Sequence, residues 1–200
     1  MIGVLALQGN FDSHIKILEK INLNHKLVKT VHDLSSLDGL IIPGGESTTI
    51  TNLLRRNQSL IDGINLLSQH KPILGSCAWL ILMSKESNDS RVHNFGFLDI
   101  TTSRNAYGRQ VHSFEASIKV KNDTISSDIQ VLFIRAPKVD EINRTVDILA
   151  TFKQEIVAVR QGKHIGISCH PELLDETLIH EICFKGKKWN ILTKLIPRKI

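Results

Sequence analysis

The stretch "KPILGSCAWLILM" (71–83) joins one apolar run to another through a Gly-Ser-Cys corner. Its first half (72–77) predicts a buried strand, and the run after the cysteine predicts a helix. On such a turn a nucleophile stands clear of its neighbours, and the N-terminus of the helix points at it. A glycine two residues before Cys77 fits this arrangement, whereas Trp79 stands where a second glycine is usual. The stretch therefore predicts a thiol displayed at the carboxyl end of a strand.

The sequence on either side of this corner predicts an α/β fold. Two more apolar runs (2–9 and 38–45) end at glycine, and helical spacing of apolar residues occurs at 13–22 and 59–70. Strands separated by helices of this length indicate βαβ units and a parallel sheet. The second half adds closely spaced short strands and a final helix over roughly 175–196. We expect one domain over residues 1–200 with a mixed, mostly parallel sheet; its later strands are expected at 111–120, 129–137, 147–153, 155–163 and 164–170.

Composition narrows the class of protein. Two hundred residues with 42% hydrophobic content suffice for one packed domain. Lys and Arg total 25 against 20 Asp and Glu, an excess too small to call for nucleic acid. No uninterrupted apolar stretch of about 18 residues predicts a membrane span. The apolar N-terminus resembles a first strand more than a signal peptide. Three cysteines without a CxxC pair argue against a disulfide framework or a zinc site, so we expect a cytoplasmic protein.

Cys77 and the segment "CHPE" (169–172) could together supply nucleophilic catalysis. A lone cysteine is more often a small buried apolar residue, but its place on the turn favours a nucleophile. His170 ends a predicted strand, and residues i and i+2 of an extended segment point the same way, so Glu172 can orient the imidazole. Cys169 points to the opposite face and is expected in the core. The remaining histidines singled out lie in polar contexts and are expected to be solvated: His14, His25, His32, His70, His93 and His180.

The segment "PGGEST" (43–48) has two interpretations. It can form a turn and a helix cap, with Ser47 or Thr48 as the capping residue. Alternatively, Gly44 and Gly45 let backbone N–H groups approach a substrate carbonyl as an oxyanion hole. A phosphate loop is disfavoured because no GK[ST] follows.

These segments together resemble a known family. A cysteine elbow after a strand, an earlier Gly-Gly loop and a late His-Pro-Glu are similar to the class I (triad) glutamine amidotransferases. Within that class the chain resembles the PdxT/SNO family, the glutaminase subunits of pyridoxal 5′-phosphate synthase, from about residue 2 to the terminal helix. The segments that carry the resemblance are "GVLALQGNF", "PGGESTT", "RNAYGRQVHSFE" (104–115), "FIRAP" (133–137) and "HPEL" (170–173).

The resemblance implies a three-layer, flavodoxin-like sandwich and a role for each matching residue. Cys77 would be the nucleophile, His170 the base and Glu172 its partner, with backbone N–H groups at Gly45 and Ala78 forming the oxyanion hole. The implied substrate is L-glutamine, and the ammonia would pass to a (β/α)₈ synthase subunit that makes pyridoxal 5′-phosphate. No metal and no cofactor are implied in this subunit. The implied glutamine-binding residues are Gly45, Glu46, Ser47, Arg104, Ile134 and Arg135.

Trp79, His112 and Cys169 depart from the family pattern, which usually has glycine, an acidic residue and phenylalanine there. Trp79 could wedge the helix away from its strand or project towards a neighbouring surface, and we expect projection. One alternative is that Trp79 disables the site and leaves a binding subunit that docks on the synthase. Another alternative is a cysteine peptidase or other acyl hydrolase, although a peptide substrate would not explain the "RN–GRQ" and "GGEST" segments.

Overall fold

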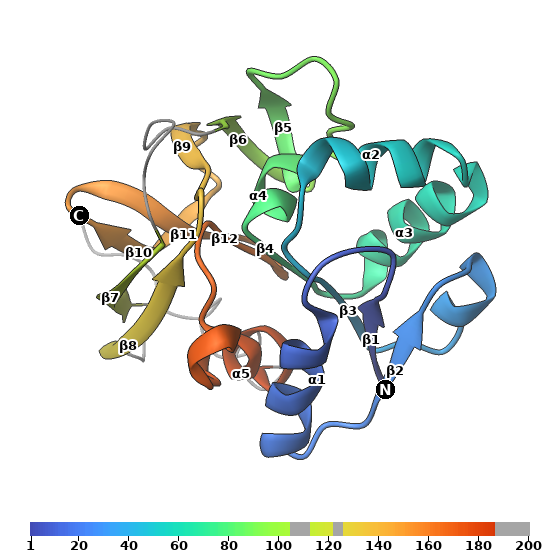
Figure 1. Ribbon diagram of the computed structural model, residues 1–200, viewed down its shortest axis with the longest axis horizontal. Coiled ribbons are helices and arrows are strands. Elements are labelled where there is room, and N and C mark those ends of the chain that lie inside the picture. The colour runs from blue at the N-terminus through green and yellow to red at the C-terminus, as the bar shows by residue number, and fades with distance from the viewer. Residues whose placement is uncertain (105–112, 122–125, 187–200) are drawn as a thin grey trace, which may run out of the picture.

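The computed structural model describes residues 1–104, 113–121 and 126–186, and their backbone centres on one mixed sheet (Figure 1). Four parallel pairings run from its first edge to β12, and four antiparallel pairings follow, so the mixed sheet is confirmed with an equal antiparallel share. Hairpins add the later strands, as expected. In sheet order the strands are β2 (His25–Val28), β1 (Ile2–Leu5), β3 (Gly39–Ile42), β4 (Ile73–Ser76), β12 (His164–Ile167), β11 (Glu155–Gln161), β10 (Asp147–Phe152), β7 (Phe114–Lys121) and β8 (Ser126–Phe133).

Helices cover both faces of the parallel half, which gives the three layers. Successive strand residues point to opposite faces, and Leu40 and Ile73 belong to one core cluster while Ile41 and Leu74 belong to another. The first cluster packs under α2 (Ser47–Arg55), α3 (Gln58–His70) and α4 (Ala78–Met83). The second packs under α1 (Phe11–Lys20) and α5 (Leu178–Phe184), on the other side of the sheet in Figure 1. Two short 3₁₀ turns complete the set, η1 (Val31–Leu34) and η2 (Glu172–Leu174).

A second, small sheet was not predicted. It consists of β5 (Ser84–Ser87), β6 (Leu98–Ser103) and β9 (Lys138–Ile142), with β6 in the middle. It lies next to α4 at the top of Figure 1. The polar sequence of β5 gives no strand signal, whereas β6 alternates buried and half-buried residues with the period of two that a strand requires. This sheet places Arg104 directly after β6.

Trp79 neither wedges the elbow apart nor projects to a surface, so the expected projection is wrong. The side chain is only 1% exposed, and its ring stacks on Phe95 with centroids 5.6 Å apart. A Cβ built on Gly75 would lie 3.1 Å from Trp79 Cβ and 2.5 Å from Met83 Sδ. Helix α4 therefore lies close to β4 because Gly75 has no side chain. The indole fills the core between α4 and the segment that follows β5.

The final helix is shorter in the described residues than predicted. Helix α5 ends at Phe184, and Ile179 and Ile182 are buried against the sheet as expected. Residues 187–196 of the predicted helix, including Ile191, lie outside the described residues. Among the described helices, none combines the length and apolar character needed to cross a membrane.

Candidate active site

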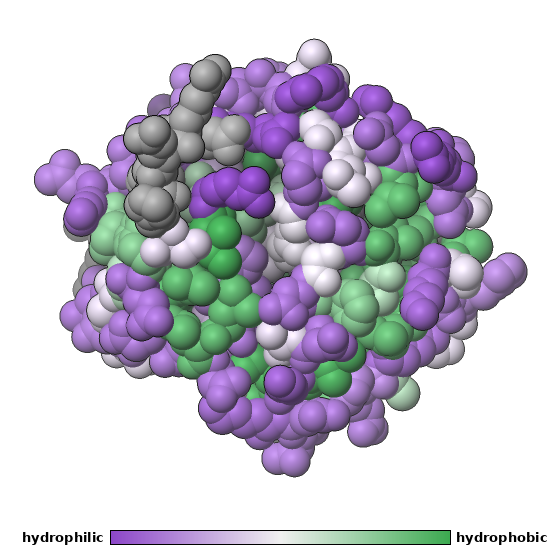
Figure 2. All heavy atoms as spheres, in the orientation of Figure 1, coloured by the Kyte–Doolittle hydropathy of each residue, from purple (hydrophilic) through white to green (hydrophobic). Residues whose placement is uncertain are grey.

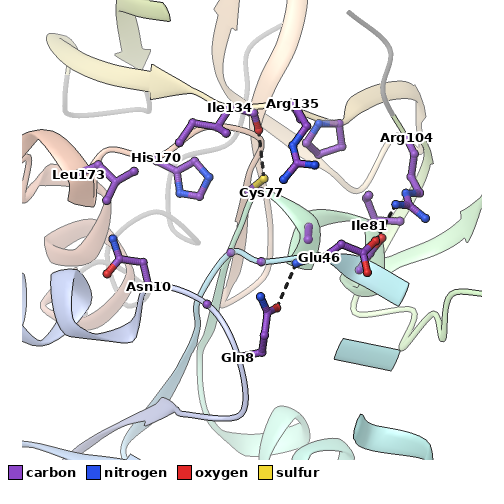
Figure 3. A pocket seen from close by; sticks show the side chains of 16 residues that line it. Gln8, Asn10, Glu46, Cys77, Ile81, Arg104, Ile134, Arg135, His170 and Leu173 are labelled. Carbon is purple, nitrogen blue, oxygen red and sulfur yellow. Dashed lines mark hydrogen bonds and ion pairs between the residues drawn. The ribbon is translucent and has the colours of Figure 1, made fainter. Parts of the chain in front are cut away.

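Cys77 lies on a strained corner between β4 and α4. Its backbone has φ 51° and ψ −113°, a conformation that non-glycine residues rarely adopt and that clusters at functional sites. The Cys77 N–H donates to the Ile167 carbonyl at 2.8 Å, which fixes the corner to β12. The thiol points into the space above the strand ends and donates to the Ile134 carbonyl at 3.7 Å (Figure 3). Strand end and helix start thus hold the sulfur in one place.

His170 and Glu172 stand beside this thiol, directly after β12. His170 Nδ1 lies 2.7 Å from Glu172 Oε1. The reason given for this contact was wrong: Pro171 is helical and Glu172 begins the 3₁₀ turn η2, so the segment is not extended. His170 N–H and C=O instead pair with Leu132 as an isolated bridge, and this anchors the ring between β12 and β8.

The charges of this buried pair support each other. Burial opposes a charge on the imidazole, but hydrogen bonds to Cys77 and Glu172 and their negative charges raise the pKa of His170 to about 10. Burial likewise opposes the charge on Glu172, but the neighbouring rings of His14 and His170 lower the pKa of its carboxyl group to about 2. At neutral pH, His170 is therefore an imidazolium held by a carboxylate.

A cavity of about 340 Å³ opens in front of the thiol. Every residue that the resemblance implied for the nucleophile, the base, the oxyanion hole or glutamine lines it. Figure 3 shows the side chains of Cys77, Arg135 and His170 facing a common space. Glu172 alone lies behind, under His170. In Figure 2 the centre of the face drawn is hollowed, with hydrophilic side chains prominent around the hollow. The lining residues among those predicted are Gly45, Glu46, Ser47, Cys77, Ala78, Arg104, Ile134, Arg135 and His170.

One wall of the cavity carries a chain of charges. Arg104 Nη2 donates to Glu46 Oε1 at 2.8 Å, and Arg104 Nη1 donates to Asp89 Oδ2 at 2.6 Å. Partial burial opposes the charge on Glu46, but hydrogen bonds from Thr48 and Thr49 lower the pKa of Glu46 to about 2. A positive and a negative group thus face the cavity side by side, as an α-amino acid requires. The rest of the "RN–GRQ" segment (105–110) and His112 lie outside the described residues.

The Gly-Gly loop passes close to the reactive groups. A Cβ on Gly44 would lie 2.6 Å from His170 Cε1 and 3.0 Å from Cys77 Cβ, so only glycine fits. A Cβ on Gly45 would collide with Gln8 Oε1. The expected helix cap was wrong: Glu46 precedes α2 and caps it, accepting from the Thr48 and Thr49 N–H groups, in place of Ser47 or Thr48.

Two histidines expected at the surface are buried behind the site. His14 is 1% exposed and His180 is fully buried, and their rings join through Nδ1 of His14 and Nε2 of His180 at 2.9 Å. His14 Nε2 lies 3.5 Å from Glu172 Oε1 and 3.4 Å from Ser76 Oγ. Cys169 is buried in the core, as expected.

Sequence reasoning also missed residues of the cavity wall. Gln8 and Asn10 follow β1, and Gln8 Oε1 accepts a hydrogen bond from the Glu46 N–H at 3.1 Å (Figure 3). The signal was available, because this segment also follows the carboxyl end of a parallel strand. The other unpredicted wall residues are Gly9, Ile81, Pro137 and Leu173, whereas Gly44 lines the wall as one of the two glycines expected near the substrate.

The chemistry available is nucleophilic attack by sulfur with proton transfer by an imidazole. The three cysteines form no disulfide. Among the described residues, no group of three or more His, Cys, Asp or Glu side chains could hold a metal ion. Ala78 is the first residue of α4, so its N–H has no partner within the helix and is available to a ligand in the cavity. Fold and site together fit the class of α/β enzymes that use a cysteine nucleophile.

Comparison with known proteins narrows this class to one family. The model of the SNO glutamine amidotransferase family matches residues 4–185. The chain is 43% identical to "Pyridoxal 5′-phosphate synthase subunit PdxT" of Oenococcus oeni over 94% of the chain and 97% of that protein. It is 44% identical to the protein of that name from Pseudothermotoga lettingae, over 90% and 92%. A solved structure, "Crystal structure of glutamine amidotransferase", aligns with a TM-score of 0.85 at 35% identity, covering 92% of this chain and 97% of that one. The chain belongs to the SNO glutamine amidotransferase family.

These matches, together with the structure, argue against the two alternatives to an active glutaminase. Family membership over nearly the whole chain disfavours a peptidase. The interpretation that Trp79 leaves a disabled binding subunit is not supported, because the indole packs in the core and the cavity remains open beside Cys77.

Proposed function

We propose that this protein hydrolyses L-glutamine to L-glutamate and ammonia and supplies the ammonia to a pyridoxal 5′-phosphate synthase. The observation that carries the proposal is the meeting of Cys77, the His170–Glu172 pair and the Arg104–Glu46 pair around one cavity. Relatives named as synthase subunits support the second half of it. We take residues 1–200 as one glutaminase domain, in the cytoplasm, without a metal or cofactor of its own.

The first half-reaction uses the charge on His170. An imidazolium beside the sulfur favours the thiolate, which attacks the side-chain amide carbon of glutamine. Backbone N–H groups of Gly45 and Ala78 receive the developing oxyanion. His170 then gives its proton to the leaving nitrogen, the C–N bond breaks, and ammonia departs from a γ-glutamyl thioester.

The second half-reaction follows from the same pKa argument. Acylation removes the negative charge from sulfur, which is one of the causes that raise the pKa of His170. The ring, now neutral, accepts a proton from water as the water attacks the thioester. The thioester bond breaks, sulfur leaves as the thiolate beside the imidazolium, and the new carboxyl group loses its proton to solvent, so glutamate is released and the starting ion pair is restored.

The α-carboxylate and α-ammonium groups of glutamine would be bound by the wall of the cavity that carries Arg104 and Glu46. Arg104 would receive the α-carboxylate and Glu46 the α-ammonium, with Ser47 and the strand-end residues Ile134 and Arg135 closing the cavity. The ammonia would pass to a (β/α)₈ synthase subunit, the partner that the family resemblance implies.

The test is ammonia and glutamate production from L-glutamine, measured with and without the synthase subunit. Cys77→Ala should abolish both products. Cys183→Ala is the matched control, since it removes a thiol that does not line the cavity, and it should stay active. A wild-type chain that releases no ammonia even with the synthase present, or an active Cys77→Ala variant, would refute the proposal.

A further inference from the structure

The pair of buried histidines behind Glu172 has no part in the mechanism above. His14 comes from α1 and His180 from α5, two helices on the face of the sheet opposite α4. Burial lowers the pKa of both rings, that of His180 to about 3, so both are neutral at physiological pH. Two neutral rings joined through nitrogen share one proton in their hydrogen bond, and which ring donates decides what His14 presents to Glu172.

The surrounding atoms favour one of the two arrangements. If His14 Nδ1 donated, the proton of His180 would sit on its Nδ1, which is buried and has no hydrogen-bond partner among the described residues. The bare Nε2 of His14 would also face the Glu172 carboxylate. In that arrangement His14 Nε2 could accept a hydrogen bond from the Ser76 hydroxyl, but the two atoms are 3.4 Å apart. A buried N–H without an acceptor and a lone pair against a buried carboxylate are both costly.

The opposite arrangement removes both costs. His180 Nε2–H donates to His14 Nδ1, so the proton of His14 lies on Nε2 and faces Glu172 Oε1 at 3.5 Å. This is the carboxylate oxygen that also binds His170 Nδ1 at 2.7 Å. Since Glu172 Oε2 has no partner among the described residues, Oε1 carries the contacts to both rings. Ser76 Oγ, beside His14, accepts the Gly44 N–H at 2.9 Å, which extends the network to the Gly-Gly loop.

We propose that His14, with its tautomer fixed by His180, is a positioning residue that holds the Glu172 carboxylate in place for His170. The titratable groups that face His14 are Glu172 and His170 from the segment after β12 and His180 from α5. The inference rests on the proposed glutaminase function, but the tautomer it requires does not. The role of His14 is to fix the geometry of the His170–Glu172 pair, so loss of His14 affects turnover more than substrate binding.

Two substitutions of His14 separate this role from plain packing. The amide NH₂ of glutamine can take the place of Nε2 and donate to Glu172, whereas the shorter asparagine places its amide near Nδ1, towards His180. His14→Gln should therefore keep most of kcat. His14→Asn should lower kcat roughly ten- to a hundredfold, the range expected for a lost hydrogen bond to a charged group, with KM for glutamine little changed. His164→Asn is the control, since it changes a half-buried histidine stacked on Phe97 outside the cavity.

A second measurement needs no activity and no variant. Nitrogen-15 NMR of histidine-labelled protein reports which ring nitrogen is protonated, and the proposal predicts the Nε2–H tautomer for both His14 and His180. The Nδ1–H tautomer at His14 would overturn it, as would equal kcat for His14→Asn and wild type. If the wild-type chain has no glutaminase activity, the proposed function fails, and the tautomer measurement still decides whether the network is arranged as inferred.

Discussion

At the scale of single residues, the site depends on the buried ion pair of His170 and Glu172, in which each residue remains charged because the other is present. Leaving an ion buried without its counter-ion costs several kcal/mol. His170 and Glu172 are both buried, and each holds the other charged. The residue types were readable from the sequence, because "CHPE" after a strand contains both. Their geometry was not, since it depends on a 3₁₀ turn that the extended-strand argument did not foresee.

The raised pKa of His170 predicts how stability depends on pH. The group binds its proton more tightly folded than unfolded, so its contribution is complete below its ordinary pKa of 6.5 and is lost as pH rises through about 10. Glu172→Gln removes the charge that supports the imidazolium and should lower stability at pH 6 by about 1.5–3 kcal/mol. Urea unfolding of both proteins at pH 6, 8 and 10 should show this difference shrinking with pH. A difference that stays constant would contradict the assignment.

Arg104 is expected to bind the α-carboxylate of glutamine. Arg104→Ala should raise KM for glutamine roughly ten- to a hundredfold, because a charge-assisted hydrogen bond is worth about 1.5–3 kcal/mol. Steady-state kinetics of ammonia release would measure this. Arg91→Ala is the matched control: Arg91 also pairs with Asp89 but is largely exposed and lies outside the cavity wall. An unchanged KM for Arg104→Ala would remove Arg104 from the substrate site.

At the scale of elements, helix α1 shows how a readable signal was missed. His14, Ile17, Leu18 and Ile21 stand at i, i+3, i+4 and i+7, the apolar stripe of an amphipathic helix. A histidine in that stripe is a buried histidine, and His14 is buried. The polar sequence context of His14 suggested a solvated side chain, whereas its position in the helix predicted the opposite.

Helix α4 is positioned by Gly75 below it and by Trp79 within it. Trp79→Gly should therefore not open the site. It should lower the free energy of unfolding by about 3–5 kcal/mol, as large-to-small changes of buried aromatic residues do, and should give no gain in glutaminase activity with the synthase present.

The control for that change is Leu66→Gly, at an exposed position in α3. It should cost only about 1 kcal/mol, the helix penalty of glycine. A rise in activity of 10² or more for Trp79→Gly, the size expected when an oxyanion donor is regained, would show that the indole obstructs the elbow.

At the scale of the whole molecule, sheet order assembles the site. Strands β3, β4 and β12 are neighbours, so the Gly-Gly loop, Cys77 and His170 lie side by side at their carboxyl ends. The convergence of these segments was predictable from the rule for parallel sheets. The adjacency of β12 and β4 was not, because it is set by packing between segments far apart in the chain. The position of Arg104 could not be predicted either, because it depends on the small sheet that the sequence did not indicate.

The central claim is that Cys77 is the nucleophile of a glutamine-specific site, and covalent labelling tests it most directly. The protein is treated with a chloroketone analogue of glutamine, in the presence of the synthase subunit, and the modified cysteine is located by peptide mass spectrometry. The account predicts a single label on Cys77, prevented by excess L-glutamine. A label that forms first on Cys169 or Cys183, or that L-glutamine does not prevent, would contradict it.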